Sequence, residues 1–452
     1  MDYISTFAHH VVSTTFDELS DAAVSAAKTC ISDTLGVGLL GSGGPLAREL
    51  AAAQSLSGTG TDARVWSLGH RLPAPAAALC NAYQIHNSEY DCVHEKAVAH
   101  VLSAVLPASL AHCERRGNVS GEELITAVTL GVDVASSLGI ASKSGLRFFR
   151  PGTVGAFGAT AALGKLLNFD HDQMVSAFSL VYGQLCGTMQ AHTEGSMLLA
   201  LQMGFNARNS VVACDLTAAG FEGPKNVLEG QFGYFKLFET EGNLDAVCEN
   251  LGHSWRICEV ALKPFPTGRA THGLIDGCLT LQREHKISPD QILRVHAKVP
   301  PLVKHLVGRP PKPTMDINYA RLCAAFVCAR TLIAGGIDLD DFCAETYADE
   351  ATRSLADRIS IDVVDSGDPN ALTPILVAIE LSDGRLLETQ VEDVYGHPHN
   401  PMKKKACIAK FRANCANAAN PLTPDQIAFL IDELDQLEVQ SDVTKLIDCM
   451  IG

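Results

Sequence analysis

The sequence predicts a mainly α protein, with a large all-helical domain built from both ends of the chain and a smaller inserted α+β domain. Hydrophobic residues make up 47% of the 452 residues, whereas aromatic residues make up only 6%. Such a composition, rich in Ala and Leu, is typical of closely packed helices with small side chains. Helical spacing of apolar residues dominates up to about residue 262, strand-like alternation follows, and helices return at the end.

The first part of the chain is expected to form a series of helices. They are predicted at 17–40, 45–56, 74–83, 98–115, 121–137, 153–167, 171–186 and 198–219, with one extended piece at 63–68. Several helix starts carry capping residues, namely Leu19-Ser20-Asp21, Ser120 with Glu123, and Asp170–Gln173.

The second part has a different texture. Strands are predicted at 292–299, 359–364, 376–381 and 386–391, with a hairpin turn at Asp383-Gly384. A proline-rich loop is expected at 300–313, a helix at 318–334, and terminal helices at 424–437 and 443–450. These elements place the α+β domain at 266–396, between helical residues 1–265 and 397–452. Ligands commonly bind at such domain junctions.

Charge and cysteine usage narrow the class of protein. The net charge of −16 and the lack of a strongly basic segment argue against a nucleic-acid partner. The fifteen cysteines are dispersed, with no C-x-x-C pair and no zinc spacing, as expected of reduced core thiols. We find neither a signal peptide nor an apolar run of transmembrane length. A cytoplasmic protein without a membrane partner is therefore expected.

The most informative segment is residues 85–100, I-H-N-S-E-Y-D-C-V-H-E-K-A-V-A-H, which we call the polar stretch. It holds three histidines and three carboxylates between two strongly apolar flanks. Such groups between buried helices must either satisfy one another through hydrogen bonds and helix caps or perform chemistry. From the residues alone, both interpretations stand.

A second candidate segment is K-P-F-P-T-G-R-A-T-H-G, which begins at Lys263. A lysine near a closed site binds a carboxylate, or acts as a base if desolvation lowers its pKa. Arg269 is suited to bidentate carboxylate binding. The alternative is a solvated basic loop.

Several other residues receive structural interpretations. Gly152–Gly158 is expected to serve helix packing, because it lacks the G-K-[ST] of a phosphate loop. His192 is expected in a loop, and Arg208 is expected to pair with Asp215 or another acid. His397 and His399 are expected to be surface loop residues without acidic partners.

The order of these motifs resembles the MmgE/PrpD family, which includes 2-methylcitrate dehydratases, cis-aconitate decarboxylases and an iminodisuccinate epimerase. The resemblance runs through nearly the whole chain. It rests on the polar stretch and on I-S-D-T-L-G-V at 31–37, G-T-V-G-A-F-G-A at 152–159, G-F-N-A-R at 204–208, G-F-E-G-P with V-L-E-G at 220–230, K-P-F-P at 263–266 and G-H-P-H-N-P-M at 396–402. It implies a homodimer, a lid formed by the α+β domain, and chemistry on small di- and tricarboxylates without a metal or organic cofactor.

The resemblance also implies roles for individual residues. His100 matches the family's active-site histidine and is expected to be the acid/base, with Asp91 as its orienter or a substrate contact. Lys263 matches a catalytic or substrate-binding lysine. Apart from the resemblance, Tyr319 near the predicted helix start is a spare acid for an elimination. Substrate-binding roles are expected for the remaining polar candidates, His94, Arg150, Arg269, His272 and Glu89. The polar stretch is then expected to face Lys263–His272 across a pocket.

The chain departs from the family pattern at several positions. Phe149 stands where the family commonly has an active-site histidine, and Leu199 where it has a functional lysine. Gln202 replaces a further histidine, and Arg150 is a hypothetical replacement for the missing cation. Within the polar stretch, Glu89 and Cys92 stand where aspartates are usual.

These observations lead to one main functional hypothesis and its alternatives. We expect a cofactor-independent lyase that abstracts an α-proton from a small hydroxy-polycarboxylate, as a 2-methylcitrate dehydratase does. An epimerase or isomerase and a cis-aconitate-type decarboxylase begin with the same proton transfer and stay open. A non-catalytic family member is the second alternative, because two charged family positions are lost.

Overall fold

The computed structural model describes residues 2–451, and the chain divides into two compact units. The helical unit comprises Met1–Met189, Leu198–Leu262 and Lys403–Gly452, and the α+β unit comprises Gln190–Met197 and Lys263–Met402. Each unit is described by itself. The fold is mainly α, as the sequence predicts. The expected inserted domain at 266–396 did not include 190–197, which belong to the α+β unit.

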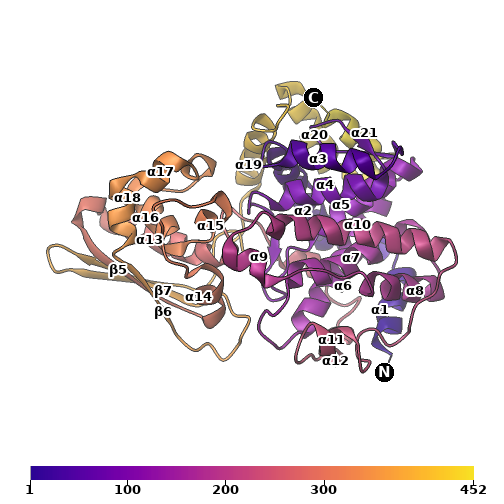
Figure 1. Ribbon diagram of the computed structural model, residues 1–452, viewed down its shortest axis with the longest axis horizontal. Coiled ribbons are helices and arrows are strands. Elements are labelled where there is room, and N and C mark those ends of the chain that lie inside the picture. The colour runs from indigo at the N-terminus through magenta and orange to yellow at the C-terminus, as the bar shows by residue number, and fades with distance from the viewer. Residues whose placement is uncertain (1, 452) are drawn as a thin grey trace. The chain divides into compact units, whose positions relative to one another are not determined.

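The helical unit contains most of the helices (Figure 1). They are α1 (Tyr3–Ser13), α2 (Asp21–Gly41), α3 (Ala47–Gln54), α4 (Ala74–His86), α5 (Leu102–Arg116), α6 (Gly121–Ala141), α7 (Arg150–Leu166), α8 (His171–Tyr182), α10 (Leu198–Ala218), α11 (Tyr234–Leu237), α12 (Asp245–Cys248), α19 (Lys404–Ala416), α20 (Pro424–Asp435) and α21 (Thr444–Cys449). Two short antiparallel pairs accompany them, β1 (Ala63–Arg64) with β2 (Arg71–Leu72) and β3 (Val93–His94) with β4 (Val260–Ala261).

Capping residues begin several of these helices as the sequence predicts. The Ser20 side chain accepts from the Ala23 amide at the start of α2. Ser120 and Asp170 form capping boxes with Glu123 and Gln173. Each box satisfies two backbone groups that a helix start would otherwise leave unbonded.

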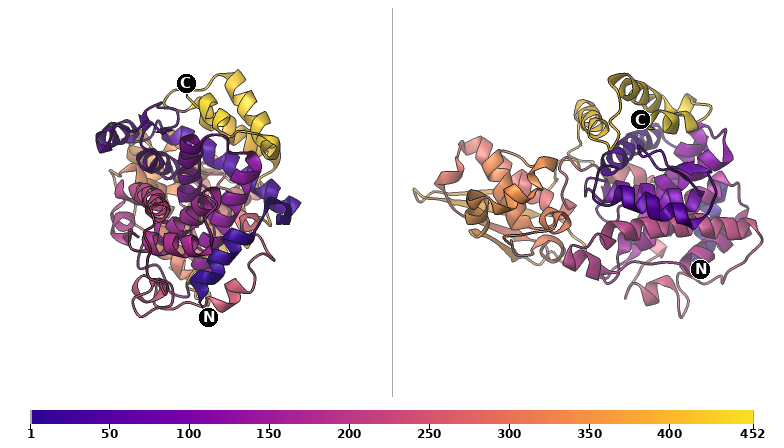
Figure 2. Two further views of the ribbon diagram at one scale, coloured as in Figure 1. Left: turned by 90° about the vertical axis from the view of Figure 1, so that its right-hand side faces the viewer. Right: turned by 45° about the horizontal axis from the view of Figure 1, so that its top comes forward.

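The N-terminal and C-terminal parts of the chain both belong to the helical unit. The C-terminal helices α19 and α20 contact α2, and the views of Figure 2 show these segments side by side. The packing of α19 against α2 matters for the site, because α19 supplies a buried lysine that contacts the polar stretch, as described below.

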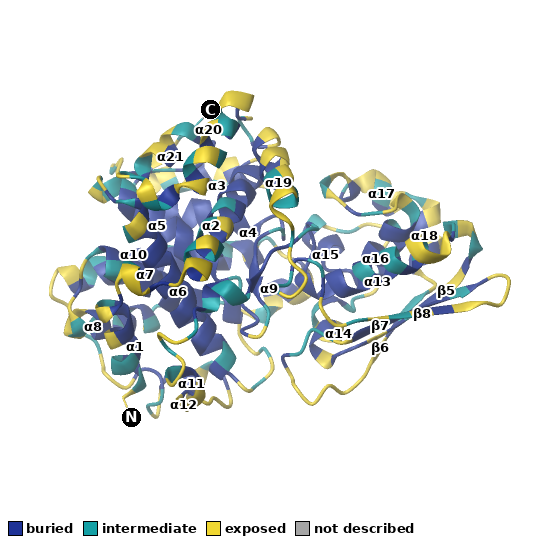
Figure 3. Cartoon of the chain, turned by 180° about the vertical axis from the view of Figure 1, so that it is seen from behind, coloured by how far each residue is buried: buried dark blue, intermediate teal, exposed yellow. Residues whose placement is uncertain are grey.

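The core of the helical unit lies around α4, α5, α6 and α7, which are almost entirely buried, and around the buried side of α10 (Figure 3). Small residues let these helices approach closely. A Cβ on Gly158 of α7 would lie 2.5 Å from the carbonyl oxygen of Gly131 in α6, closer than packed atoms allow. The interpretation of 152–158 as a helix-packing segment is confirmed.

Helix α6 corrects one expectation. Its 21 residues are long and apolar enough, by length and composition alone, to cross a membrane, although no such run was expected. Its most apolar window is 94% buried inside the structure. This burial is the pattern of a core helix.

The α+β unit is built on a four-stranded sheet in the order β6-β5-β7-β8. Its strands are β5 (Ile292–Val299), β6 (Ile359–Val363), β7 (Ile375–Leu381) and β8 (Leu386–Val391). β6 is parallel to β5, whereas β7 is antiparallel to both β5 and β8. All four strands lie where the sequence predicts them.

Helices complete this unit, and α13 contacts β7 and β8. They are α13 (Arg269–His285), α14 (Pro301–Val307), α15 (Ile317–Arg321), α16 (Ala324–Ala334), α17 (Ala344–Ala348) and α18 (Glu350–Ala356). The short helix α9 (Met189–Glu194) also belongs to this unit, except for its first residue, Met189, which is assigned to the helical unit. Short 3-10 turns occur in both units at Phe16–Glu18, Ser55–Ser57, Arg256–Glu259, Pro289–Gln291, Leu339–Asp341 and Leu437–Val439.

Two predictions in this region were wrong. The expected loop at 300–313 contains α14, because Pro301 occupies the first turn, where a helix tolerates proline. The expected helix at 318–334 is broken before Ala324. Cys323 has extended backbone angles and forms an isolated β-bridge with Gly308, which interrupts the helical hydrogen bonds.

Candidate active site

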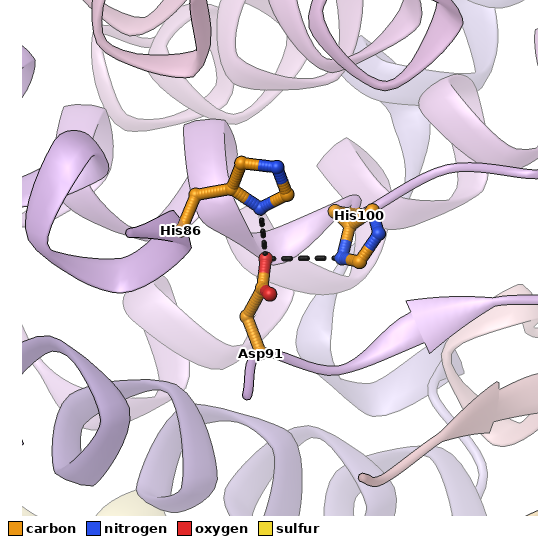
Figure 4. Close-up of side chains that lie close together, drawn as sticks. All are labelled: His86, Asp91 and His100. Atoms are coloured by element: carbon orange, nitrogen blue, oxygen red, sulfur yellow. Dashed lines mark hydrogen bonds and ion pairs between the residues drawn. The ribbon is translucent and has the colours of Figure 1, made fainter. Parts of the chain in front are cut away.

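The polar stretch folds into a buried cluster in which one carboxylate bridges two imidazoles (Figure 4). Asp91 Oδ2 lies 2.8 Å from His86 Nδ1 and 3.0 Å from His100 Nδ1. The Ser103 hydroxyl donates to the same oxygen at 2.5 Å. His86 and Asp91 are buried, while the His100 side chain remains 14% exposed.

Local structure explains how these groups meet. His86 is the last residue of α4, Asp91 precedes β3, and His100 lies just before α5. The chain between them is folded back by two backbone hydrogen bonds between His94 and Ala99, of 2.9 and 3.3 Å. The turns need left-handed backbone angles at Glu89 and Val98, with φ of 53° and 49°. Residues fourteen positions apart therefore share one carboxylate.

A hydrogen bond determines which nitrogen of His86 carries a proton. An ionised carboxylate only accepts hydrogen bonds, so His86 Nδ1 donates to Asp91, whereas His100 Nδ1 lies within ion-pair distance of the same oxygen. In a neutral imidazole the proton-accepting nitrogen is then Nε2. The negative charge of Asp91 also stabilises an imidazolium that forms when Nε2 takes up a proton. The cluster therefore has the composition of an acid/base group.

The rings of the two histidines stand edge to face, with centroids 4.7 Å apart. His86 Nε2 lies 3.9 Å from Glu89 Oε1, and the Phe149 ring lies 5.9 Å from the His86 ring. Phe149 thus presents an apolar surface close to the cluster, at a position where the family commonly has a histidine.

Lys410, which the sequence did not single out, holds the polar stretch in place. Lys410 of α19 is buried, donates to the Tyr90 carbonyl at 3.0 Å, and pairs with Asp33 of α2 at 2.7 Å. Its ammonium also lies 4.0 Å from the centre of the Tyr90 ring. Asp33, a charged residue within the apolar run of α2, was the signal that could have pointed to a buried cationic partner.

His94 does not join the bridging carboxylate. Its Nε2 lies 3.3 Å from Glu259 Oε2, and Arg256 donates to the same carboxylate at 2.7 Å. Burial opposes the charge of Glu259, but the hydrogen bond from His94 and the Arg256 charge prevail and hold the pKa of Glu259 at about 2. The contact ties β3 to the turn before β4, so a structural role for His94 is supported, and its substrate-binding role stays a prediction.

Arg150 has a different environment from the one expected. Its guanidinium donates to both oxygens of Glu239, at 2.9 and 3.0 Å, and to the Ser144 carbonyl at 2.8 Å. The Arg150 side chain is fully buried. Because a buried carboxylate already balances its charge, the structure does not support the hypothesis that Arg150 replaces the missing substrate-binding cation.

In the α+β unit, the segment that begins at Lys263 is buried, so the alternative of a solvated basic loop is wrong. Arg269 donates to the carbonyls of Tyr395 and Val394 at 2.8 and 3.3 Å, and lies 3.3 Å from His272 Nδ1. His272 Nε2 lies 3.3 Å from the Thr267 carbonyl. These contacts hold the segment, and the site roles of Lys263, Arg269 and His272 stay predictions.

Tyr319 was expected to be a spare acid. Its hydroxyl donates to the Pro310 carbonyl at 2.8 Å, and its ring lies against the cations of Arg309 and Lys312. Burial raises the pKa of Tyr319. Because the hydroxyl proton is committed to a carbonyl, proton donation by Tyr319 would first require that hydrogen bond to break.

Three minor expectations were wrong. His192 lies in α9 instead of a loop, and its carbonyl accepts from Arg309 at 3.0 Å. Arg208 bonds to the neighbouring Asn209, because Asp215 is already paired with Arg115 at 2.7 Å. His397 and His399 do have an acidic partner, as described below.

Two groups of side chains in the described part of the chain bring ligand atoms close enough to hold a metal ion. They are the bridged cluster itself and a separate group in the α+β unit, Asp393 with His397 and His399.

The fold and the bridged cluster together define a mainly α protein with side chains suited to acid/base chemistry. Family models identify the family at the level of sequence. The MmgE/PrpD N-terminal domain matches residues 5–246 and the MmgE/PrpD C-terminal domain matches residues 265–436. The chain belongs to the MmgE/PrpD family.

Curated relatives agree with this assignment. Cis-aconitate decarboxylase of Mus musculus is 26% identical over 462 residues, which cover 98% of this chain and 92% of the relative. Cis-aconitate decarboxylase of Aspergillus terreus is also 26% identical, over 99% of this chain and 96% of the relative. The human cis-aconitate decarboxylase gives the same identity over 95% of this chain and 91% of the relative. The chain is therefore an enzyme related to those that act on carboxylates.

Proposed function

We propose that this protein is a lyase that decarboxylates a small unsaturated di- or tricarboxylate of the cis-aconitate type, with His100 as the proton donor. The observation that carries the proposal is the single buried carboxylate that bridges His86 and His100. The names of the similar proteins support decarboxylation over the other reactions of the family.

The proposed reaction needs one proton. Loss of carbon dioxide breaks one carbon–carbon bond, and its electron pair forms a new double bond. The electron pair of the former double bond then takes a proton at the neighbouring carbon. The His100 imidazolium supplies that proton from Nε2, and Asp91 stabilises the charged form until transfer. Solvent then restores the proton, so the net reaction consumes one proton and releases one carbon dioxide.

Exposure favours His100 over His86 as the donor. The His100 side chain is 14% exposed, whereas that of His86 is 1% exposed. A catalytic acid must reach the substrate within hydrogen-bond distance. His86, which shares the carboxylate, fits a positioning role or the second acid/base of a two-proton reaction.

The runner-up is dehydration of a hydroxy-polycarboxylate related to 2-methylcitrate. Elimination of water needs a base for the carbon acid and an acid for the departing hydroxyl. The presence of two imidazoles on one carboxylate favours this reading. Two-base epimerisation is less well supported, because it requires bases on opposite faces of one carbon and these rings lie side by side.

Incubation in deuterated water with cis-aconitate, 2-methylcitrate, citrate and related acids separates these reactions. Decarboxylation releases one carbon dioxide and places one deuterium on a product carbon, which NMR detects. Dehydration gives an unsaturated acid without carbon dioxide. If the folded protein neither turns over nor exchanges any candidate, the proposal fails and the non-catalytic alternative gains support.

A further inference from the structure

A second cluster of titratable side chains lies in the α+β unit, on the loop that follows β8. Asp393 Oδ1 lies 3.4 Å from His397 Nδ1 and 3.2 Å from His399 Nδ1. The two imidazole rings stand edge to face, with centroids 4.8 Å apart. These side chains take no part in the proposed reaction, so the cluster needs an explanation of its own.

The hydrogen bonds of the loop identify the protonation state of one ring. The His399 backbone N–H donates to His397 Nδ1 at 3.2 Å. A backbone N–H donates only to an unprotonated nitrogen, so this Nδ1 carries a lone pair. That lone pair already accepts the His399 N–H, so a metal bound at Nδ1 would replace this hydrogen bond, and it would also replace the hydrogen bond of 3.2 Å between His399 Nδ1 and Asp393 Oδ1. The negative charge of Asp393, 3.4 Å from His397 Nδ1, would attract a cation to this position.

The separations match those of a transition-metal site. Zinc binds histidine nitrogen and carboxylate oxygen at roughly 2.0–2.1 Å, so two ligand atoms at tetrahedral positions stand about 3.3 Å apart. The two nitrogen–oxygen distances bracket this value, and all three ligand atoms lie within 4.8 Å of one another. Rotation of the His399 side chain, which is 73% exposed, can close the remaining gap.

The loop is built to hold its shape. Gly396 has a φ of 90°, in the left-handed region that favours glycine. Its amide donates to the Asn400 carbonyl at 2.8 Å, and the Asn400 amide donates back to the His397 carbonyl at 2.8 Å. The Asn400 side chain donates to the Asp393 carbonyl at 3.0 Å. Preorganised ligands lose less entropy when a metal binds.

We propose that Asp393, His397 and His399 form a surface site for a divalent transition metal, with zinc the best match. One carboxylate and two neutral imidazoles supply three ligands, and water completes the tetrahedron. The site lies on the G-H-P-H-N-P loop, so the bound metal would clasp this loop after β8. The proposal stands independently of the reaction assigned to the bridged cluster.

Calorimetric titration of the full-length protein with zinc chloride tests the site. We expect one equivalent of zinc to bind, and the affinity to fall by about tenfold or more in His399→Ala and in Asp393→Asn, because each removes a ligand. His305→Ala is the matched control, since His305 is an exposed histidine on α14 of the same unit. The control should bind zinc like the unaltered protein.

Cobalt substitution gives an independent readout. Tetrahedral cobalt bound to these ligands should show visible d–d bands in the unaltered protein and lose them in the double variant His397→Ala/His399→Ala. Circular dichroism checks that the variants remain folded, and His399→Ala alone suffices if the double variant is not. Absence of zinc binding, or undiminished zinc binding in these variants, overturns the proposal. Undiminished binding would place the metal elsewhere, including at His86, Asp91 and His100.

Discussion

At the scale of single residues, the decisive feature is that Asp91 serves two histidines. A carboxylate held by His86, His100 and Ser103 is restrained in position and orientation. The family resemblance implied that His100 and Asp91 are partners, but the sequence did not reveal that His86 shares the same oxygen. Spacing along the chain does not encode this, because the turns between the residues bring them together.

Replacing His100 with alanine tests the proposed proton donor. Loss of general acid catalysis should lower turnover by about 10²–10⁴-fold while leaving the fold intact. Turnover on the substrate found in the deuterium experiment and circular dichroism measure the two effects. His9→Ala, which changes an exposed histidine on α1, should leave turnover unchanged. Near-normal activity in His100→Ala would contradict the assignment.

His112 predicts a pH dependence of stability. Burial, followed by the neighbouring charges of Arg115 and Arg116, lowers the pKa of His112 from 6.5 to about 4. The unfolded chain therefore binds a proton more readily, and stability is lost as pH falls from about 6.5 towards 4. Between pH 7 and pH 5 this group alone should cost about 2 kcal/mol of unfolding free energy.

Urea unfolding at the two pH values measures this effect. His112→Gln keeps a polar side chain but removes the titration, so its unfolding free energy should fall less on acidification. If the variant and the unaltered protein lose the same stability between pH 7 and pH 5, His112 does not contribute as described.

At the scale of elements, backbone pairing explains which predicted strands and helices the structure contains and which it does not. All four strands of the sheet matched their predicted positions, because alternation and the Asp383-Gly384 turn specify register locally. The helix predicted at 318–334 failed because Cys323 pairs with Gly308, a contact made by residues from another segment. Local periodicity carries no information about that partner.

Helix α19 provides a test of how elements support the site. Lys410→Met would remove the lysine charge from the buried Asp33 carboxylate and the hydrogen bond to the Tyr90 carbonyl. Breaking a buried ion pair by removing one partner typically costs about 3–5 kcal/mol. We expect a loss of that order in urea unfolding, together with reduced turnover, because Tyr90 immediately precedes Asp91.

Lys405→Met is the matched control, since Lys405 is exposed on the same helix. Its unfolding free energy should change by less than about 0.5 kcal/mol. The double variant Asp33→Asn/Lys410→Met should recover part of the lost stability, because it removes the buried charge as well. Equal stability of Lys410→Met and Lys405→Met would contradict the role of Lys410.

At the scale of the whole molecule, the family assignment rests on nearly the entire chain, whereas the oligomeric state is a proposal. We propose a homodimer, as the resemblance implies. Three large apolar side chains, Phe221, Phe232 and Leu237, are exposed. An interface that covers such side chains removes apolar surface from water, which is favourable. Sedimentation equilibrium at micromolar concentration should give twice the mass of the chain. A monomer under these conditions would contradict the proposal.

The sequence by itself determined the fold class, most element positions, the family and the segment that carries the acid/base groups. These features depend on local periodicity, capping and the order of motifs, all of which are written along the chain. The family resemblance also implied that His100 and Asp91 act together.

Only the tertiary structure decided which charged side chains form ion pairs with one another. Arg150 binds Glu239, Lys410 binds Asp33, and Asp393 meets two histidines that were expected to have no acidic partner. The partners of Arg150 and Lys410 lie 89 and 377 positions away along the chain. An ion pair depends on distance in space, and folding brings such groups within reach without leaving a local pattern in the sequence.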